Sequence, residues 1–245
     1  SVKVLPELDA EIGKVMRRID ALNNAPNSTL SLHLMVLSDH GMSSVAENRE
    51  INLETMIKRR QIKYLINDGV TVSIWPKSGY REAVLRLIRQ SEEPNMEFYR
   101  KEEIPTSWQL KGHSRVPPVL LVAKSGYFFK SRELEFPYEG GYPLEGWHGY
   151  APDSIDMHSP FFFYGPRSET GSRIETLEIV DLYQLMCHVI ELPTAPHNGS
   201  WERVRPLLSD EAHSLKYLPG PAPAAEERHR RKKLKASSAS LHMPR

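Results

Sequence analysis

The chain has 245 residues, of which 40% are hydrophobic and 26% charged, and its formal net charge is +1. This length fits one large domain or two small ones, and the composition is that of an average soluble globular protein. The near-neutral charge argues against a broad nucleic-acid-binding surface, no apolar run approaches the roughly 18 residues of a membrane span, and the single cysteine cannot form an internal disulfide.

The first predicted elements are a helix and a strand. Residues 1–23 carry apolar side chains at steps of three and four, which indicates an amphipathic helix. Residues 30–37, with the sequence LSLHLMVL, form a short apolar run that is typical of a fully buried strand. A helix followed by a strand after a short loop is the rhythm of an α/β sheet, and His33 within this strand is expected to be a core or sheet histidine.

The middle of the chain predicts a hairpin, a helix and a further strand. Residues 63–66 and 70–75 flank Asn67-Asp68-Gly69, which is a strong hairpin signal. Residues 80–90 have the period of an amphipathic helix, with Val84, Leu85 and Ile88 predicted to face inward. Residues 119–123 read as a strand, and residues 126–160 as a long loop whose aromatic content argues against disorder.

The last third of the chain predicts a strand at 161–164 and a helix at 176–190. The face of this helix predicted to be buried carries Ile179, Leu182, Tyr183, Met186 and Ile190. Residues 30–37, 71–75, 119–123 and 161–164 are expected in one largely buried sheet. The globular part is assigned to residues 1–208, and residues 209–245 are expected to be a Pro/Ala-rich and then basic disordered tail, because they lack core-forming side chains.

Two short segments carry side chains suited to metal chemistry. Asp39 and His40 directly follow the first buried strand, at the sheet edge where α/β proteins bind ligands. Carboxylate oxygen and imidazole nitrogen are common ligands of Zn²⁺, although an Asp-His pair also occurs as a helix cap beside a surface histidine. His148 lies between two glycines in GWHGY on the long loop, a context poorly explained as core.

These segments, together with others in the same order, resemble the ecto-nucleotide pyrophosphatase/phosphodiesterase family of the alkaline phosphatase superfamily. The matching segments are LSDHGM at 37–42, GWHGY at 146–150, Met157 to Phe161 with Tyr164-Gly165-Pro166, and residues 181–188 with 195–200. The resemblance covers residues 1–208. It implies an α/β fold of the alkaline-phosphatase-like sandwich type, a central sheet flanked by helices, incomplete on its N-terminal side.

The resemblance also implies a chemistry. The family hydrolyses phosphodiester or pyrophosphate bonds with two zinc ions and a covalent phosphoryl-enzyme intermediate. Asp39 and His40 match the ligands of the zinc that activates the nucleophile, and His148 matches a ligand of the other zinc. We therefore expect these three side chains to converge within about 4–8 Å of one another. Trp147 and Tyr150 are candidates for the substrate pocket.

Two features of the family are expected to lie outside this chain. The Thr or Ser nucleophile and a D-x-x-x-H ligand pair precede the matched segments in the family, and no histidine here has an aspartate four residues before it. Three of the roughly seven ligands that two four-coordinate zinc ions need are present. The chain alone is therefore expected to be inactive. The alternative is a non-catalytic fragment or binding module that keeps the fold but lacks the nucleophile.

The remaining expectations concern substrate, location and modification. The substrate is expected to be a small phosphodiester, either a nucleotide or a choline phosphodiester, and no nucleic-acid duplex is expected as a partner. The resemblance implies the cell surface or the extracellular space. Asn27 and Asn198 each begin a glycosylation sequon. Cys187 matches a position that is disulfide-bonded in the family, so its partner lies outside this chain or the thiol is a buried apolar group.

Overall fold

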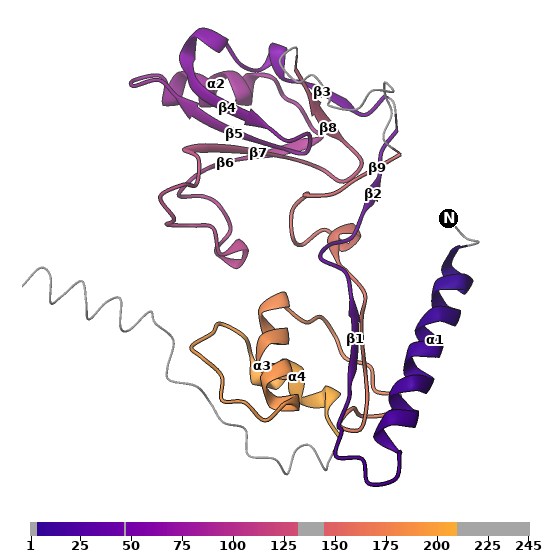
Figure 1. The fold of residues 1–245 in the computed structure, drawn as a ribbon. Helices are drawn as coiled ribbons and strands as arrows, with labels where there is room; N and C mark the ends of the chain where they lie inside the picture. The colour runs from indigo at the N-terminus through magenta and orange to yellow at the C-terminus, as the bar shows by residue number, and fades with distance from the viewer. Residues whose placement is uncertain (1–3, 47, 132–144, 210–245) are drawn as a thin grey trace, which may run out of the picture. The chain divides into compact units, whose positions relative to one another are not determined.

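The computed structural model describes residues 4–46, 48–131 and 145–209, and these residues form two compact units. The inserted unit comprises residues 37–160, and the terminal unit comprises the described residues before and after it. Figure 1 shows the elements of each unit. The predicted tail lies outside the described residues from 210 onward.

The inserted unit is built around a four-stranded sheet with strand order β4-β5-β7-β6. Its strands are β4 (Ile62–Asn67), β5 (Thr71–Pro76), β6 (Met96–Arg100) and β7 (Val119–Ala123), and all neighbours pair antiparallel. The hairpin predicted around Asn67-Asp68-Gly69 is confirmed: Gly69 has a positive φ of 99°, and Asp68 accepts from the Thr71 amide and hydroxyl.

Helix α2 (Arg81–Gln90) covers one face of this sheet (Figure 1). Val84, Leu85 and Ile88 are fully buried, as their spacing predicts. They pack with Val72, Ile74, Val119 and Leu121 in the main core. Burying one such aliphatic side chain contributes about 1.5–3 kcal/mol, so this layer is a major source of the unit's stability.

Short strands and turns complete the inserted unit. The strands are β2 (Ser43–Ser44) with β9 (Gly146–Trp147), antiparallel, and β3 (Glu50–Asn52) with β8 (Phe128–Lys130), parallel. The 3₁₀ turns are η1 (Leu53–Thr55), η2 (Arg59–Gln61), η3 (Thr106–Trp108) and η4 (Ile155–Met157).

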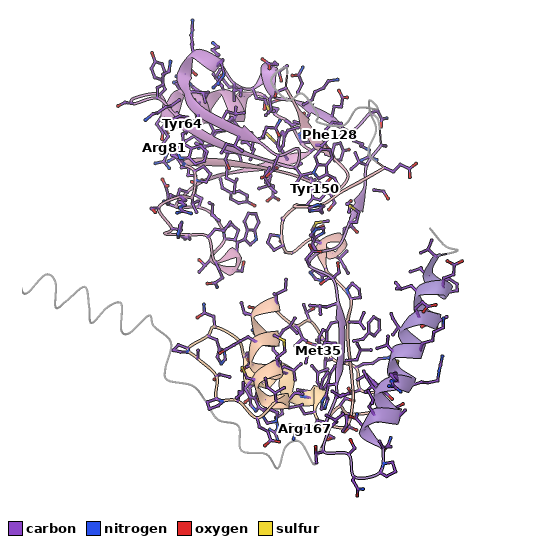
Figure 2. The ribbon with its side chains drawn as sticks, in the orientation of Figure 1. Met35, Tyr64, Arg81, Phe128, Tyr150 and Arg167 are labelled. Atoms are coloured by element: carbon purple, nitrogen blue, oxygen red, sulfur yellow. The ribbon has the colours of Figure 1, made fainter. Side chains whose placement is uncertain are left out.

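The terminal unit contains helix α1 (Val4–Asn23), strand β1 (Leu34–Leu37) paired with β10 (Phe161–Tyr164), helix α3 (Ile179–Val189), helix α4 (Trp201–Val204) and the turn η5 (Arg205–Leu207). Its core is formed by Leu185, Val189, Val204, Leu207 and Leu208. Met35 of β1, labelled in Figure 2, packs against this core.

Three expectations about packing are wrong. The four predicted strands do not share one sheet, since β1 and β10 pair with each other and β5 and β7 belong to the four-stranded sheet. Strands β1 and β10 are only half-buried, and Phe162 is 65% exposed. A short run of apolar side chains predicts that a segment forms a strand, but it does not specify the strand with which that segment pairs.

The buried face of α3 is also opposite to the predicted one. Ile179 and Ile190 are exposed, whereas Asp181, Gln184 and His188 are buried. The Asp181 carboxylate accepts hydrogen bonds from the Ser200 amide and from Nε of Arg203, both 2.6 Å long. The free-energy cost of burying the Asp181 carboxylate is therefore offset by hydrogen bonds, which a ranking of residues by polarity does not predict.

Candidate functional site

Asp39 and His40 lie in the turn that follows β1, in the inserted unit. The Ser38 hydroxyl donates to the His40 carbonyl over 2.8 Å, and the His40 amide donates to Asp39 Oδ1 over 3.0 Å. These local bonds fix the turn. The Asp39 side chain is 82% exposed, so its second oxygen is open to a ligand.

The hydrogen bonds of His40 determine its tautomer. Nδ1 lies 2.8 Å from the Gly41 carbonyl, which can only accept, so Nδ1 carries the proton in the neutral imidazole. Nε2 then presents a lone pair 3.4 Å from Asp39 Oδ2. A carboxylate oxygen beside an imidazole lone pair is a donor set that suits a divalent cation such as Zn²⁺.

His148 joins this pair through strand pairing. Ser43 of β2 is opposite Trp147 of β9, which brings the residue after Trp147 to the segment that carries His40. The imidazoles of His40 and His148 stack with ring centroids 3.6 Å apart and planes 15° apart. The structure therefore brings together the three side chains that the sequence motifs single out.

A close backbone approach holds the site segment in place. The Gly41 amide donates to the Met157 carbonyl over 3.0 Å, and a Cβ atom at Gly41 would lie 2.0 Å from the Asp156 carbonyl oxygen. The buried Ser43 hydroxyl donates to Asp156 Oδ2 over 2.9 Å. Ser43 and Asp156 are positioning residues that sequence reasoning missed; the only available signal was that Asp156 directly precedes the matched segment beginning at Met157.

The two pocket candidates lie against the core of the inserted unit. Trp147 stacks on Phe128 with ring centroids 6.2 Å apart, and its ring covers Gly69, where a Cβ would come within 2.1 Å. Tyr150 is 5% exposed and donates its hydroxyl to the Tyr127 carbonyl (Figure 2). Burial raises the pKa of Tyr150 to about 12, so its hydroxyl stays neutral.

The charge of Asp39 is favoured by its surroundings. Desolvation opposes ionisation, but the positive charge that His40 carries when protonated, the backbone amides and the Ser38 hydroxyl outweigh it, and the pKa of Asp39 lies below its ordinary value. The carboxylate is therefore ionised at neutral pH, as a cation ligand must be. Within residues 4–46, 48–131 and 145–209, no group of three or more His, Cys, Asp or Glu side chains is arranged to hold one metal ion.

A groove of about 510 Å³ opens beside Met42 and Ser43, which follow Asp39 and His40 in the chain. It is lined by Met42, Ser43, Ser44, Val45, Ala46, Arg49, Ser125, Gly126 and Asp156. A Cβ atom at Gly146, two residues before His148, would touch the Met42 side chain at 3.0 Å.

Comparison with known proteins decides the family. Residues 2–151 match the family described as type I phosphodiesterase / nucleotide pyrophosphatase. The chain belongs to this phosphodiesterase family. A curated relative is human ectonucleotide pyrophosphatase/phosphodiesterase family member 5, 29% identical over 231 residues, which are 91% of this chain and 46% of the relative. Mouse bis(5′-adenosyl)-triphosphatase is 32% identical over 210 residues, 85% of this chain and 43% of the relative.

Solved structures of this phosphodiesterase family show the same fold. The human family member 5 structure has a TM-score of 0.70 at 30% identity, and covers 85% of this chain and 52% of its own. An inactive variant of the murine protein, solved in complex with AMP, has a TM-score of 0.68 at 30% identity, with 84% and 52% covered. The fold is therefore the alkaline-phosphatase-like α/β fold that the motifs predict, and the chain spans about half the length of the relatives it matches.

Proposed function

We propose that this chain forms part of an enzyme that hydrolyses phosphodiester or pyrophosphate bonds in adenine nucleotides. The observation that carries the proposal is the convergence of Asp39, His40 and His148 from motifs far apart in the sequence. The relative named as a bis(5′-adenosyl)-triphosphatase and the family structure solved with AMP support a nucleotide over a choline phosphodiester.

The donor atoms fit a two-zinc site. Asp39 and the unprotonated Nε2 of His40 would hold one ion, and His148 would be a ligand of the second. The two stacked imidazoles are nearly parallel, so their nitrogens do not point to one common ion. The 3.6 Å between the ring centroids is similar to the roughly 3.5–4 Å between ions in two-metal sites, which suits one ion for each ring. When bound, zinc ions supply charge stabilisation for the attacking and leaving oxygens.

In this proposal, neighbouring residues of the chain hold the metal-ligand side chains in position. Gly41 and Ser43 fix the turn that presents Asp39 and His40, through bonds to Met157 and Asp156. Our proposal includes a covalent phosphoryl-enzyme intermediate formed on a nucleophile that is not among the residues assigned here. It also retains the expectation that the chain alone is inactive.

We also propose that the protein works outside the cell. The curated relatives include an enzyme whose name begins with ecto, and both sequon asparagines, Asn27 and Asn198, are exposed in turns or loops. In the described part of the chain, no helix has the length and apolar character that crossing a membrane requires. Glycosylation at Asn27 and Asn198 belongs to this proposal.

The test measures AMP release from bis(5′-adenosyl) triphosphate by a full-length enzyme containing this chain. Asp39→Ala and His148→Ala are expected to lower kcat by orders of magnitude with little change in thermal stability. His158→Ala is the matched control, because His158 is exposed and lies in a matched segment without a proposed ligand role. Full activity in either site variant would contradict the proposal.

A non-catalytic binding module is the second candidate. It is favoured by the finding that no three-ligand metal cluster is present within the described residues. A module of this kind would bind AMP with the same affinity in the presence of Zn²⁺ and of a chelator. Loss of AMP binding on chelation, together with the activity loss above, would favour the enzyme.

A further inference from the structure

The face of the four-stranded sheet opposite α2 is covered over only half its width. Antiparallel pairing places Ile66 opposite Ser73, Ser73 opposite Leu120 and Leu120 opposite Tyr99, so these residues share that face. Over β7 and β6, Ile104, Trp108 and Val116 pack against Leu120 and Val122, which are 7% and 4% exposed. Over β4, Tyr64 and Ile66 are each 59% exposed.

The uncovered half carries an aromatic pair. Tyr64 of β4 is directly opposite Trp75 of β5, so the two rings lie on neighbouring strands and on the same face as Ile66. The Lys63 ammonium lies 5.1 Å from the centre of the Tyr64 ring (Figure 2 labels Tyr64). Apolar side chains that lie side by side on an exposed strand face, unlike singly scattered ones, are typical of interaction sites.

Four basic side chains gather at the same end of this hairpin. Ile62 pairs with Pro76, and the Lys77 amide donates to the Gln61 carbonyl over 2.8 Å, so the residues before β4 lie beside the residue after β5. Besides Arg59, the basic residues at this end are Lys58, Arg60, Lys63 and Lys77, and these four are all exposed. Among the described residues, no carboxylate forms an ion pair with any of these four.

We propose that this surface, Tyr64, Ile66 and Trp75 with Lys58, Arg60, Lys63 and Lys77, binds a linear sulfated polysaccharide. The name "β4–β5 face" is used for these seven residues. Sugar rings present apolar faces that pack on aromatic side chains, while sulfate groups pair with unneutralised Lys and Arg. The inference rests on the extracellular location proposed above, where such polysaccharides occur, and it is independent of the metal site.

Charge complementarity favours a repeating polyanion over a single small anion. The four cations belong to three separate segments at one end of a hairpin, and all four side chains are exposed. A chain of regularly spaced sulfates engages several such cations at once and releases condensed counterions. The affinity is therefore expected to fall steeply with salt.

The test is titration of a fluorescent heparin oligosaccharide with the full chain at several NaCl concentrations. The variant carrying Lys58→Gln, Arg60→Gln, Lys63→Gln and Lys77→Gln is expected to lose affinity at least about tenfold at physiological salt. The slope of log affinity against log salt should fall by about 3–4. Tyr64→Thr keeps a strand-forming residue and should weaken binding without changing that slope.

The matched control removes four exposed charges elsewhere: Arg17→Gln, Arg86→Gln, Lys111→Gln and Lys124→Gln. Its affinity and salt slope should stay close to those of the parent chain, and circular dichroism should show both quadruple variants folded. A second control replaces Arg230, Arg231, Lys232 and Lys233 of the basic tail by Gln.

Three outcomes would overturn the proposal. The first is equal losses in the β4–β5 variant and in the dispersed-charge control, which would indicate a nonspecific effect of net charge. In the second, binding is lost only in the tail variant. In the third, a single-stranded oligonucleotide binds more tightly than the heparin oligosaccharide, which would assign the β4–β5 face to nucleic acid instead.

Discussion

The imidazole of His40 stacks on the imidazole of His148 at a centroid distance of 3.6 Å, although the two residues belong to segments at opposite ends of the inserted unit. The orientation of the His40 ring is fixed by the contact between its Nδ1 and the Gly41 carbonyl, 2.8 Å apart. The stacked pair is the arrangement on which the proposed zinc site depends.

Zinc titration of this chain tests that organisation directly. We expect weak Zn²⁺ binding by calorimetry, because an incomplete ligand set gains less from binding, and further weakening in His148→Ala. The unfolding midpoint in urea should stay close to that of the parent chain. His158→Ala should leave zinc binding unchanged. If His158→Ala weakened zinc binding as much as His148→Ala does, the assignment of His148 as a ligand would be contradicted.

Gly41→Ala should damage the site through the backbone. The new Cβ would lie 2.0 Å from the Asp156 carbonyl oxygen, so the turn carrying His40 must shift away from Met157. We expect weaker zinc binding and destabilisation by about 1–3 kcal/mol in urea unfolding, the range of overpacked positions.

The matched control for Gly41→Ala is Gly13→Ala in α1. Among the described side chains, a Cβ at that position would meet the flexible end of Arg17 at 3.4 Å. Alanine in a helix interior stabilises by about 0.5–1 kcal/mol relative to glycine. Opposite signs for the two substitutions are expected. Destabilisation by Gly13→Ala alone would show that the contact at Gly41 does not limit the backbone.

Arg203→Ala should destabilise the terminal unit. Arg203 donates from Nε and Nη2 to Asp181, a carboxylate with no exposed surface. Because Arg203 itself is 35% exposed, we expect a cost of about 1–3 kcal/mol, less than for a fully buried pair. Arg173→Ala, at an exposed position with no described partner, should have little effect in the same denaturant assay.

This pair also predicts an acid-sensitive component of stability. Burial opposes ionisation of Asp181, but Arg203 and the Ser200 and Glu178 amides outweigh it, so the pKa of Asp181 lies below its ordinary value. Its contribution is fully present above the ordinary carboxyl pKa and is lost as pH falls through the lowered folded value. Asp181→Asn should flatten this acid limb, and an unchanged limb would contradict the assignment.

The titration of His33 is expected to make the stability of the folded state depend on pH closer to neutrality. Nδ1 lies 3.0 Å from the Ser31 carbonyl and Nε2 accepts from the Arg167 amide over 3.1 Å, so the folded state holds the neutral ring. Burial is the main cause that lowers the pKa of His33 from 6.5. The unfolded chain therefore binds the proton first, and stability falls as pH drops from about 6.5 towards the lowered value.

His33→Gln separates this effect from other titrations. Glutamine keeps an acceptor for the Arg167 amide but does not titrate. The difference in urea midpoint between parent and variant should change with pH in the window below 6.5 and be constant above it. A difference that is constant throughout would show that His33 keeps its ordinary pKa in the folded state.

Local patterns in the sequence predict local structure well here. The period of residues 81–90 identifies the buried face of α2, and Asn67-Asp68-Gly69 identifies the hairpin, because both depend on neighbours in sequence. The proximity of His40 and His148 was expected from the ordered motifs of a family resemblance. The periodicity of hydrophobic residues alone does not predict that His40 and His148 lie close together.

Long-range pairing was the part that the sequence did not reveal. The partners of β1 and β5 depend on which strands meet in three dimensions, and the inward face of α3 depends on Arg203 reaching Asp181 from α4. Helix α3 has apolar residues around much of its circumference, so their spacing alone does not single out the buried face, which also carries the polar residues Asp181, Gln184 and His188. Their hydrogen-bond partners are distant in sequence and cannot be read from a local window.

The pairing of β2 with β9 also predicts an order of events in folding. The four-stranded sheet lies within the sequence interval between Ser44 and Gly146, whose two ends this short pairing joins. Closing a long flexible loop costs entropy, and that cost falls once the hairpin and its neighbouring strands have already condensed. The stacked histidines are therefore expected to form last and to open first, so that the site can come apart while the sheet remains folded.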